Sequence, residues 1–159
     1  MTTFSLAPMV FSRLSGLESI PIQHAPEAAT MSWKQGALLI YDVSSVNRIK
    51  EAGADPAVVQ GVAMVAASGT TDKDVPFIVP APGVLFEVSM DESGLQGVYV
   101  LAASDRGKQY GAAKDSTTGF WYLDQDETSV KVFEIVDFVS AVGDITPRVI
   151  VKFTLTAME

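Results

Sequence analysis

The residues that could perform chemistry are few and lie far apart along the chain. His24 is the single histidine, and it stands in a segment bounded by Pro21 and Pro26. A catalytic triad would have to use it as the general base, and such a base needs a rigid scaffold to hold its position. The chain also lacks the Gly-x-Ser-x-Gly elbow that presents a nucleophilic serine. These residues therefore indicate a protein that is not an enzyme. A small β-class hydrolase that brings two carboxylates together from distant strands stays an alternative.

Three groups of carboxylates are close enough in sequence to share a hard cation. They are Asp72 with Asp74, Asp91 with Glu92, and Asp124 with Asp126 and Glu127. Calcium takes roughly six to eight oxygen ligands, and a full calcium loop carries acidic or amide residues at regular positions around a glycine. None of the three groups has that density of ligands. Solvated turns are the simpler interpretation, and a bound calcium ion stays an alternative.

Aromatic residues offer a different chemistry, which is the stacking of sugar rings. Trp121 and Tyr122 fall together inside an apolar run, and Tyr99 lies in another. Side chains in such runs pack more often in a core or an interface than on an open platform. A tail, fibre or carbohydrate-binding module that uses these residues is the alternative to a structural role. The chain has no phosphate-binding glycine motif, and no cofactor is expected.

Composition narrows the classes of partner. The 159 residues carry a formal net charge of −8 and include no cysteine, which excludes disulfides and thiolate metal sites. An acidic surface repels phosphate groups, so neither nucleic acid nor a membrane is an expected partner. Hydrophobic residues make up 48% of the chain, which favours burial of part of the surface against other copies. The first residues lack the pattern of a secretory signal, so we expect synthesis in the cytoplasm.

The elements that must position these residues are mainly strands. Short apolar runs alternate with turn residues and predict about seven or eight strands, which indicates an all-β fold, either a small β-sandwich or a β-barrel. Short helices are expected over residues 46–52 and 55–59, from a serine cap and from a proline at a first helical position. The expected strands cover residues 36–41, 61–67, 75–80, 83–89, 97–103, 119–123, 130–136 and 148–155.

The opening segment, residues 1–31, follows neither a helical nor an alternating period. It predicts an extended N-terminal arm that reaches a neighbouring chain, followed by a β domain over residues 32–159. The alternative is that the arm folds back on its own barrel. The candidate partner-binding residues are the large apolar side chains of this arm and the tryptophan that follows it: Phe4, Leu6, Met9, Phe11, Leu14 and Trp33.

The order of segments after the arm resembles the head decoration, or capsid cement, proteins of tailed bacteriophages. The likeness covers roughly residues 33 to 155, and each of its motifs is short. The segments are Trp33-Lys-Gln-Gly-Ala-Leu-Leu39, Gly61-Val-Ala-Met-Val-Ala-Ala67, Val75-Pro-Phe-Ile-Val-Pro-Ala-Pro-Gly83, Gly119-Phe-Trp-Tyr-Leu-Asp124, Val132-Phe-Glu-Ile-Val-Asp137 and Val149-Ile-Val-Lys-Phe153.

This resemblance implies a structural virion protein that binds the outer surface of the major capsid protein lattice. It implies a homo-oligomer, commonly a trimer, which clamps neighbouring capsomers after the shell expands. It implies no catalytic residues. The protein would be made in the host cytoplasm and end on the outer capsid surface of the virion.

Overall fold

The computed structural model describes residues 6–44, 47–92 and 97–158, and the regular secondary structure in this part of the chain is almost entirely β. The all-β prediction is confirmed. Besides the strands, two single turns of 3-10 helix occur, η1 (Ala103–Asp105) and η2 (Thr156–Met158). The strands are β1 (Val10–Leu14), β2 (Ile22–Pro26), β3 (Leu38–Tyr41), β4 (Ile49–Glu51), β5 (Gly61–Ala63), β6 (Asp74–Ile78), β7 (Val84–Asp91), β8 (Gln109–Lys114), β9 (Trp121–Asp124), β10 (Phe133–Phe138) and β11 (Arg148–Phe153).

The larger sheet closes into a barrel, which we call the C-terminal barrel. Its strands run in the order β1-β7-β11-β10-β8-β9, and β7 also pairs with β9 in parallel. This second pairing joins the two ends of the run, so β7, β11, β10, β8 and β9 form a closed ring of five strands. Closure leaves few strand edges free to pair with other chains. β1 pairs with the first half of β7, at Val84 to Glu87.

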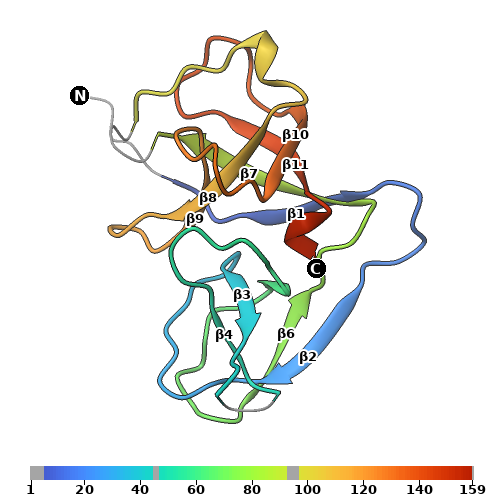
Figure 1. Ribbon diagram of the computed structural model, residues 1–159, viewed down its shortest axis with the longest axis vertical. Coiled ribbons are helices and arrows are strands. Elements are labelled where there is room, and N and C mark those ends of the chain that lie inside the picture. Colours follow the sequence, from blue (N-terminus) through green and yellow to red (C-terminus); the bar gives the residue numbers. More distant parts are fainter. Residues whose placement is uncertain (1–5, 45–46, 93–96, 159) are drawn as a thin grey trace.

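The other sheet, which we call the N-terminal sheet, has the order β2-β6-β5-β3-β4, and all its neighbouring strands are antiparallel. A parallel bridge between Glu27 and Ile49 brings the end of β2 back to β4. In Figure 1 the C-terminal barrel lies above this sheet, and β1 crosses between the two.

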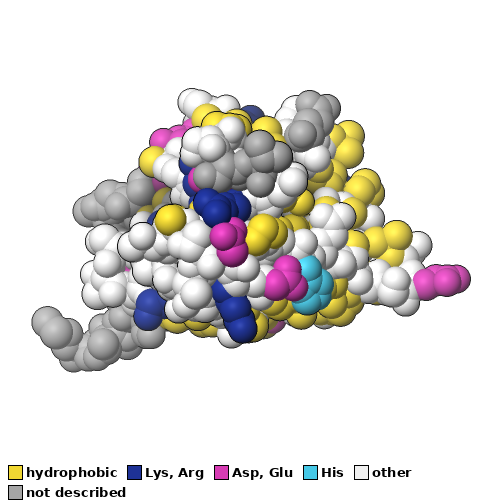
Figure 2. Space-filling view, turned by 90° about the horizontal axis from the view of Figure 1, so that it is seen from below, with side chains coloured by type: hydrophobic (Ala, Val, Ile, Leu, Met, Phe, Trp, Pro, Cys, Tyr) yellow, Lys and Arg dark blue, Asp and Glu magenta, His cyan; other side chains and the backbone are white. Residues whose placement is uncertain are grey.

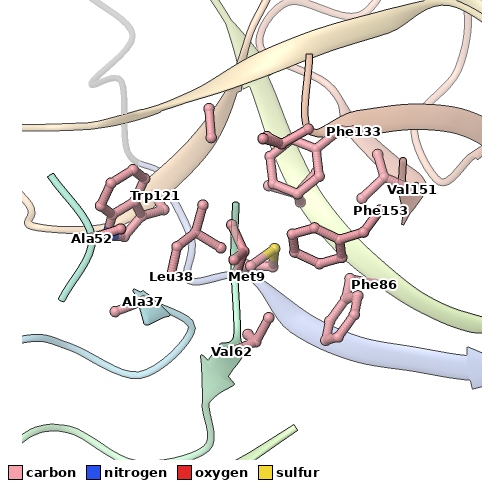
Figure 3. Close-up of a cluster of buried hydrophobic side chains, with 14 of the residues drawn as sticks. Met9, Ala37, Leu38, Ala52, Val62, Phe86, Trp121, Phe133, Val151 and Phe153 are labelled. Carbon is pink, nitrogen blue, oxygen red and sulfur yellow. The ribbon is translucent and has the colours of Figure 1, made fainter. Parts of the chain in front are cut away.

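One hydrophobic core joins the two sheets. Leu38 and Val62 from the N-terminal sheet belong to the same buried cluster as Phe86, Phe133 and Phe153 from the barrel. The ring of Phe153 packs edge-on against Phe86, with 5.4 Å between ring centroids. Figure 3 shows the side chains of both units converging on this cluster. The two units are therefore held together by apolar packing rather than by a flexible linker.

Both helices expected from the sequence are wrong. Ile49–Glu51, inside the first, form β4 and pair with β3, and Ile49 is fully buried. A helix of seven residues is unstable in isolation, and strand pairing buries Ile49 where a solvated helix would not. Asp55 has φ 47°, a left-handed conformation that does not begin a helix, and residues 55–59 contain no helical turn.

The expected arm is likewise corrected, because the described part of residues 1–31 is built into this chain's own sheets. β1 pairs with β7 of the barrel, and β2 pairs with β6 of the N-terminal sheet. The segment shows no single period because it supplies one short strand to each of two sheets, with a sharp connection at Gly16 (φ 81°) between them. The alternative, an arm that folds back on its own barrel, describes this structure.

Candidate interaction surface

The residues expected to bind a partner lie mainly inside the molecule. Leu6, Met9 and Trp33 are 2%, 1% and 1% exposed. Met9 sits in the joint between the two sheets, where its backbone approaches Gly36 so closely that a Cβ there would collide with it. Phe11 and Leu14 are partly buried against the same core. Phe4 lies outside the described residues.

Trp33 shows why these side chains are not available to another chain. Its indole Nε1 donates a hydrogen bond of 3.1 Å to the carbonyl oxygen of Val65, so both its polar atom and its rings are used internally. The large apolar side chains near Pro8 and Pro26 belong to segments that pack in the core of this chain. Burial of a side chain of this size contributes about 2 to 3 kcal/mol to folding.

Exposed apolar side chains gather instead at the end of the barrel that is farthest from the N-terminal sheet. We call this group the distal patch. Each member is β-branched and has about half or more of its surface exposed, from 49% to 62%. Figure 1 shows the two segments that carry them, yellow and orange-red, at the top of the molecule. The members are Val98, Val100, Val139, Val142 and Ile145.

Backbone hydrogen bonds hold the two halves of the distal patch side by side. Val100 and Ile145 form an antiparallel bridge. On one side of it, the amide of Gly143 donates to the oxygen of Leu101 at 2.8 Å, and on the other the amide of Thr146 donates to the oxygen of Tyr99 at 2.8 Å. The strand expected over residues 97–103 is not formed beyond this bridge, although Leu101 is buried next to the exposed Val100. The patch is therefore a paired surface and not a loose loop.

A buried carboxylate, that of Asp105, forms hydrogen bonds with the first segment of the patch. Asp105 is fully buried, and the Tyr99 hydroxyl lies 2.8 Å from each of its oxygens. The backbone amide of Ala102 also donates to Asp105 Oδ2 at 2.9 Å. Burial, and then the hydrogen bond to Asp105, raise the pKa of the Tyr99 hydroxyl. The hydroxyl consequently stays protonated at neutral pH and keeps donating to Asp105.

The distal patch is also poor in charge. Residues 98–102 and 139–147 contain one charged residue, Asp144, in a chain with 19% charged residues. The carboxylate of Asp144 accepts a hydrogen bond of 3.0 Å from the amide of Ala141, which ties it to its own turn. Depletion of charge at the centre of a surface is typical of a protein–protein interface.

The end of the molecule opposite the distal patch carries charged as well as hydrophobic side chains. Figure 2 shows that end, where hydrophobic side chains gather toward one side and charged groups are mixed among the rest. One of the charged pairs joins β2 to β6: His24 Nδ1 lies 3.0 Å from Asp74 Oδ2, and both side chains are more than half exposed. Water competes for such a pair, so it contributes little to stability.

Trp121 and Tyr122 do not form the alternative, a sugar-binding platform, on the described surface. Trp121 and Tyr122 are each 2% exposed. The Trp121 indole donates to Glu51 Oε2 at 3.0 Å, and Lys114 pairs with the other oxygen of the same carboxylate. These contacts connect β9 and β8 of the barrel to β4 of the N-terminal sheet. Trp121 therefore packs in the joint between the two units, and the core interpretation of this residue is confirmed.

No protein-family model matches the chain, and a search of curated proteins finds no match. Within residues 6–44, 47–92 and 97–158, no helix is long and apolar enough to cross a membrane. The same residues contain no group of three or more histidine or acidic side chains that could hold a metal ion. The distal patch is a candidate interaction surface, because it groups five exposed apolar side chains in a part of the chain that is poor in charge.

Proposed function

We propose that this chain is a structural virion protein that decorates a phage capsid. It binds the outer surface of the major capsid protein lattice as a homo-oligomer, for which three copies is the expected number. The observation that carries the proposal is the distal patch, a paired, charge-poor apolar surface at one end of a closed barrel. The order of the sequence segments, which resembles that of capsid cement proteins, supplies the class of partner.

The distal patch has the properties that a permanent protein contact needs. Five aliphatic side chains that are about half or more exposed would lose their remaining contact with water on docking. Burial of apolar surface stabilises a contact by roughly 25 cal/mol per Å². Because the backbone of the patch is already paired and supported by Asp105, docking orders few additional groups. A preorganised surface therefore binds with a smaller entropic cost.

The construction of the whole chain suits a clamp. The core is continuous from the N-terminal sheet to the C-terminal barrel, so force applied at the patch is transmitted to the rest of the molecule. A rigid body that bridges two capsomers adds buried area across their joint, and separation of the capsomers must then break that contact as well. The protein would thus slow the separation of capsomers under the internal pressure of the capsid, without a chemical step.

The proposal is tested by binding to expanded empty capsids of the cognate phage. We expect the natural chain to sediment with the capsids, and the double variant Val142→Asp with Ile145→Asp to remain in the supernatant, because two buried carboxylates cannot be solvated in an apolar contact. Val43→Asp is the matched control, since Val43 is 95% exposed on a turn of the N-terminal sheet. Equal sedimentation of all three proteins contradicts the role of the patch.

A further inference from the structure

A fully buried carboxylate lies at the end of β7 and is not part of the distal patch. Asp91 is 0% exposed. Its Oδ2 accepts a hydrogen bond of 2.9 Å from the amide of Gly97, whereas its Oδ1 is buried and has no hydrogen-bond partner. Among the described residues Asp91 takes part in none of the ion pairs. A buried charge without a counter-charge is strongly unfavourable.

A second buried oxygen without a partner lies in the segment that precedes β11. The hydroxyl oxygen of Thr146 is also buried and unpartnered. β7 and β11 are antiparallel with Ser89 opposite Arg148, and the amide of Met90 donates to the oxygen of Pro147 at 2.9 Å. Continuing this register by one residue brings the backbone of Thr146 toward the end of β7, and the left-handed φ of 49° at Thr146 ends the extended pairing there. A buried carboxylate oxygen without a donor requires a group that is positive or that donates hydrogen bonds.

A third oxygen-bearing side chain is contributed by β9. The parallel pairing of β7 with β9 sets Asp91 directly opposite Asp124, and side chains of directly opposed residues lie on the same face of a sheet. Asp124 is 5% exposed. One of its oxygens accepts a hydrogen bond of 3.0 Å from the amide of Asp126. Two nearly buried carboxylates are therefore adjacent on one face of the sheet.

We propose that Asp91 and Asp124, together with the Thr146 hydroxyl, bind a divalent cation, with calcium preferred over magnesium. The donor set consists of oxygen atoms alone, which hard cations prefer and zinc does not. Asp91 and Asp124 come from different strands and Thr146 from the segment before β11, and calcium tolerates such irregular geometry, whereas magnesium demands a near-ideal octahedron. Water molecules would complete the shell. With two charged ligands the affinity should be low, with a dissociation constant of about 0.1 to 1 mM.

The position of this site gives the cation a structural role. Gly97, which donates to Asp91, directly precedes Val98, and Thr146 directly follows Ile145. The cation would therefore join the starts and ends of the two segments that form the distal patch. This site does not depend on the identity of the docking partner, and its test uses the isolated chain.

The test is a calcium titration of the full chain after removal of metal ions with a chelator. We expect isothermal titration calorimetry to show one saturable site per chain, and the melting temperature to rise with calcium because binding favours the folded state. Asp91→Asn keeps the shape and removes the charge, so it should weaken calcium binding by more than about tenfold. Its melting temperature in chelator should equal or exceed that of the natural chain.

Two further variants make the result decisive. Asp124→Asn should lose the calcium response in the same way, and it decides the outcome if Asp91→Asn does not fold. Asp55→Asn removes an exposed carboxylate from the N-terminal sheet side of the molecule and should respond as the natural chain does. The proposal is overturned if the natural chain shows no response up to about 10 mM calcium, well above the weakest protein sites, or if the two site variants keep it. An equal response to magnesium overturns the preference for calcium.

Discussion

Glu27 illustrates how a buried charge is accommodated where partners are present. It is fully buried, and its carboxylate organises the turn at residues 68–70. Oε1 accepts a hydrogen bond of 2.8 Å from the amide of Gly69, and Oε2 accepts bonds from the amide and the hydroxyl of Ser68 at 3.0 and 2.8 Å. The contrast with Asp91, which has one oxygen without a partner, is the basis for the proposed cation site.

Glu27→Ala should therefore be strongly destabilising. The change leaves the amides of Ser68 and Gly69 without their acceptor, and loss of such charge-assisted hydrogen bonds should lower the free energy of unfolding by about 3 kcal/mol. Urea unfolding followed by tryptophan fluorescence measures this change. Glu18→Ala, which removes an exposed carboxylate, is the control and should change stability by less than about 0.5 kcal/mol. Equal stability of the two variants would show that Glu27 does not hold the turn.

Removal of the N-terminal segment should affect the stability of both sheets, because β1 and β2 each pair with a strand of a different sheet. Deletion of residues 1–31 would expose the edges of β7 and β6 and remove Met9 from the shared core. We expect the truncated chain to be unfolded or aggregated rather than a stable β domain. Circular dichroism and a thermal melt measure this outcome. A cooperative transition at the natural melting temperature would mean that these strands are dispensable.

How far the elements could be predicted depends on how much local signal each one carries. β6, β7, β9, β10 and β11 coincide with apolar runs closed by turn residues, and these runs were sufficient to find them. β8 carries Gly111, Ala112 and Ala113 at its centre and has few β-formers, so its strand character comes from pairing with β9 and β10. A Cβ at Gly111 would collide with Glu127 and with the oxygen of Val130. This close approach is a tertiary requirement that no local pattern reveals.

Only one of the two segments of the distal patch carries a sequence pattern that predicts its exposed side chains. Val98 and Val100 belong to an alternating run, from which one exposed face follows. Val139, Val142 and Ile145 lie in a turn-rich segment without a period, and their meeting with the first half depends on the long-range bridge between Val100 and Ile145. The prediction of an extended arm over residues 1–31 was wrong for a different reason. The apolar residues of this segment are evident in the sequence, but sequence alone does not show whether a short apolar strand packs on its own chain or on another.

At the scale of the whole molecule, hydrogen bonds and ion pairs to carboxylates contribute to the response to acid. Hydrogen bonds from Arg48 lower the pKa of Asp72, and those from Lys152 and Gln109 lower the pKa of Glu134. The amide of Phe138, and then Arg13, lower the pKa of Asp137. Because the folded-state pKa of each group lies below its unfolded value of 3.8 or 4.5, the stabilisation is present above that value and is lost as pH falls through the folded pKa.

The free energy of unfolding should therefore be nearly constant from pH 7 to about pH 5 and fall progressively below about pH 4.5. Urea unfolding at a series of pH values measures this profile. Arg48→Met should make the decline shallower, because Asp72 would then titrate closer to its ordinary value. A profile that stays flat down to about pH 3 would show that these carboxylates titrate alike in the folded and unfolded chain.

The orientation of the chain on a particle is the most direct measure of the proposed function. An electron cryomicroscopy reconstruction of expanded capsids saturated with the protein should show density for this chain on the outer surface. We predict that the distal patch, with Val142 and Ile145, faces the major capsid protein, and that the exposed His24–Asp74 pair lies away from it. A reconstruction without bound protein, or one in which the distal patch faces solvent, would contradict the account.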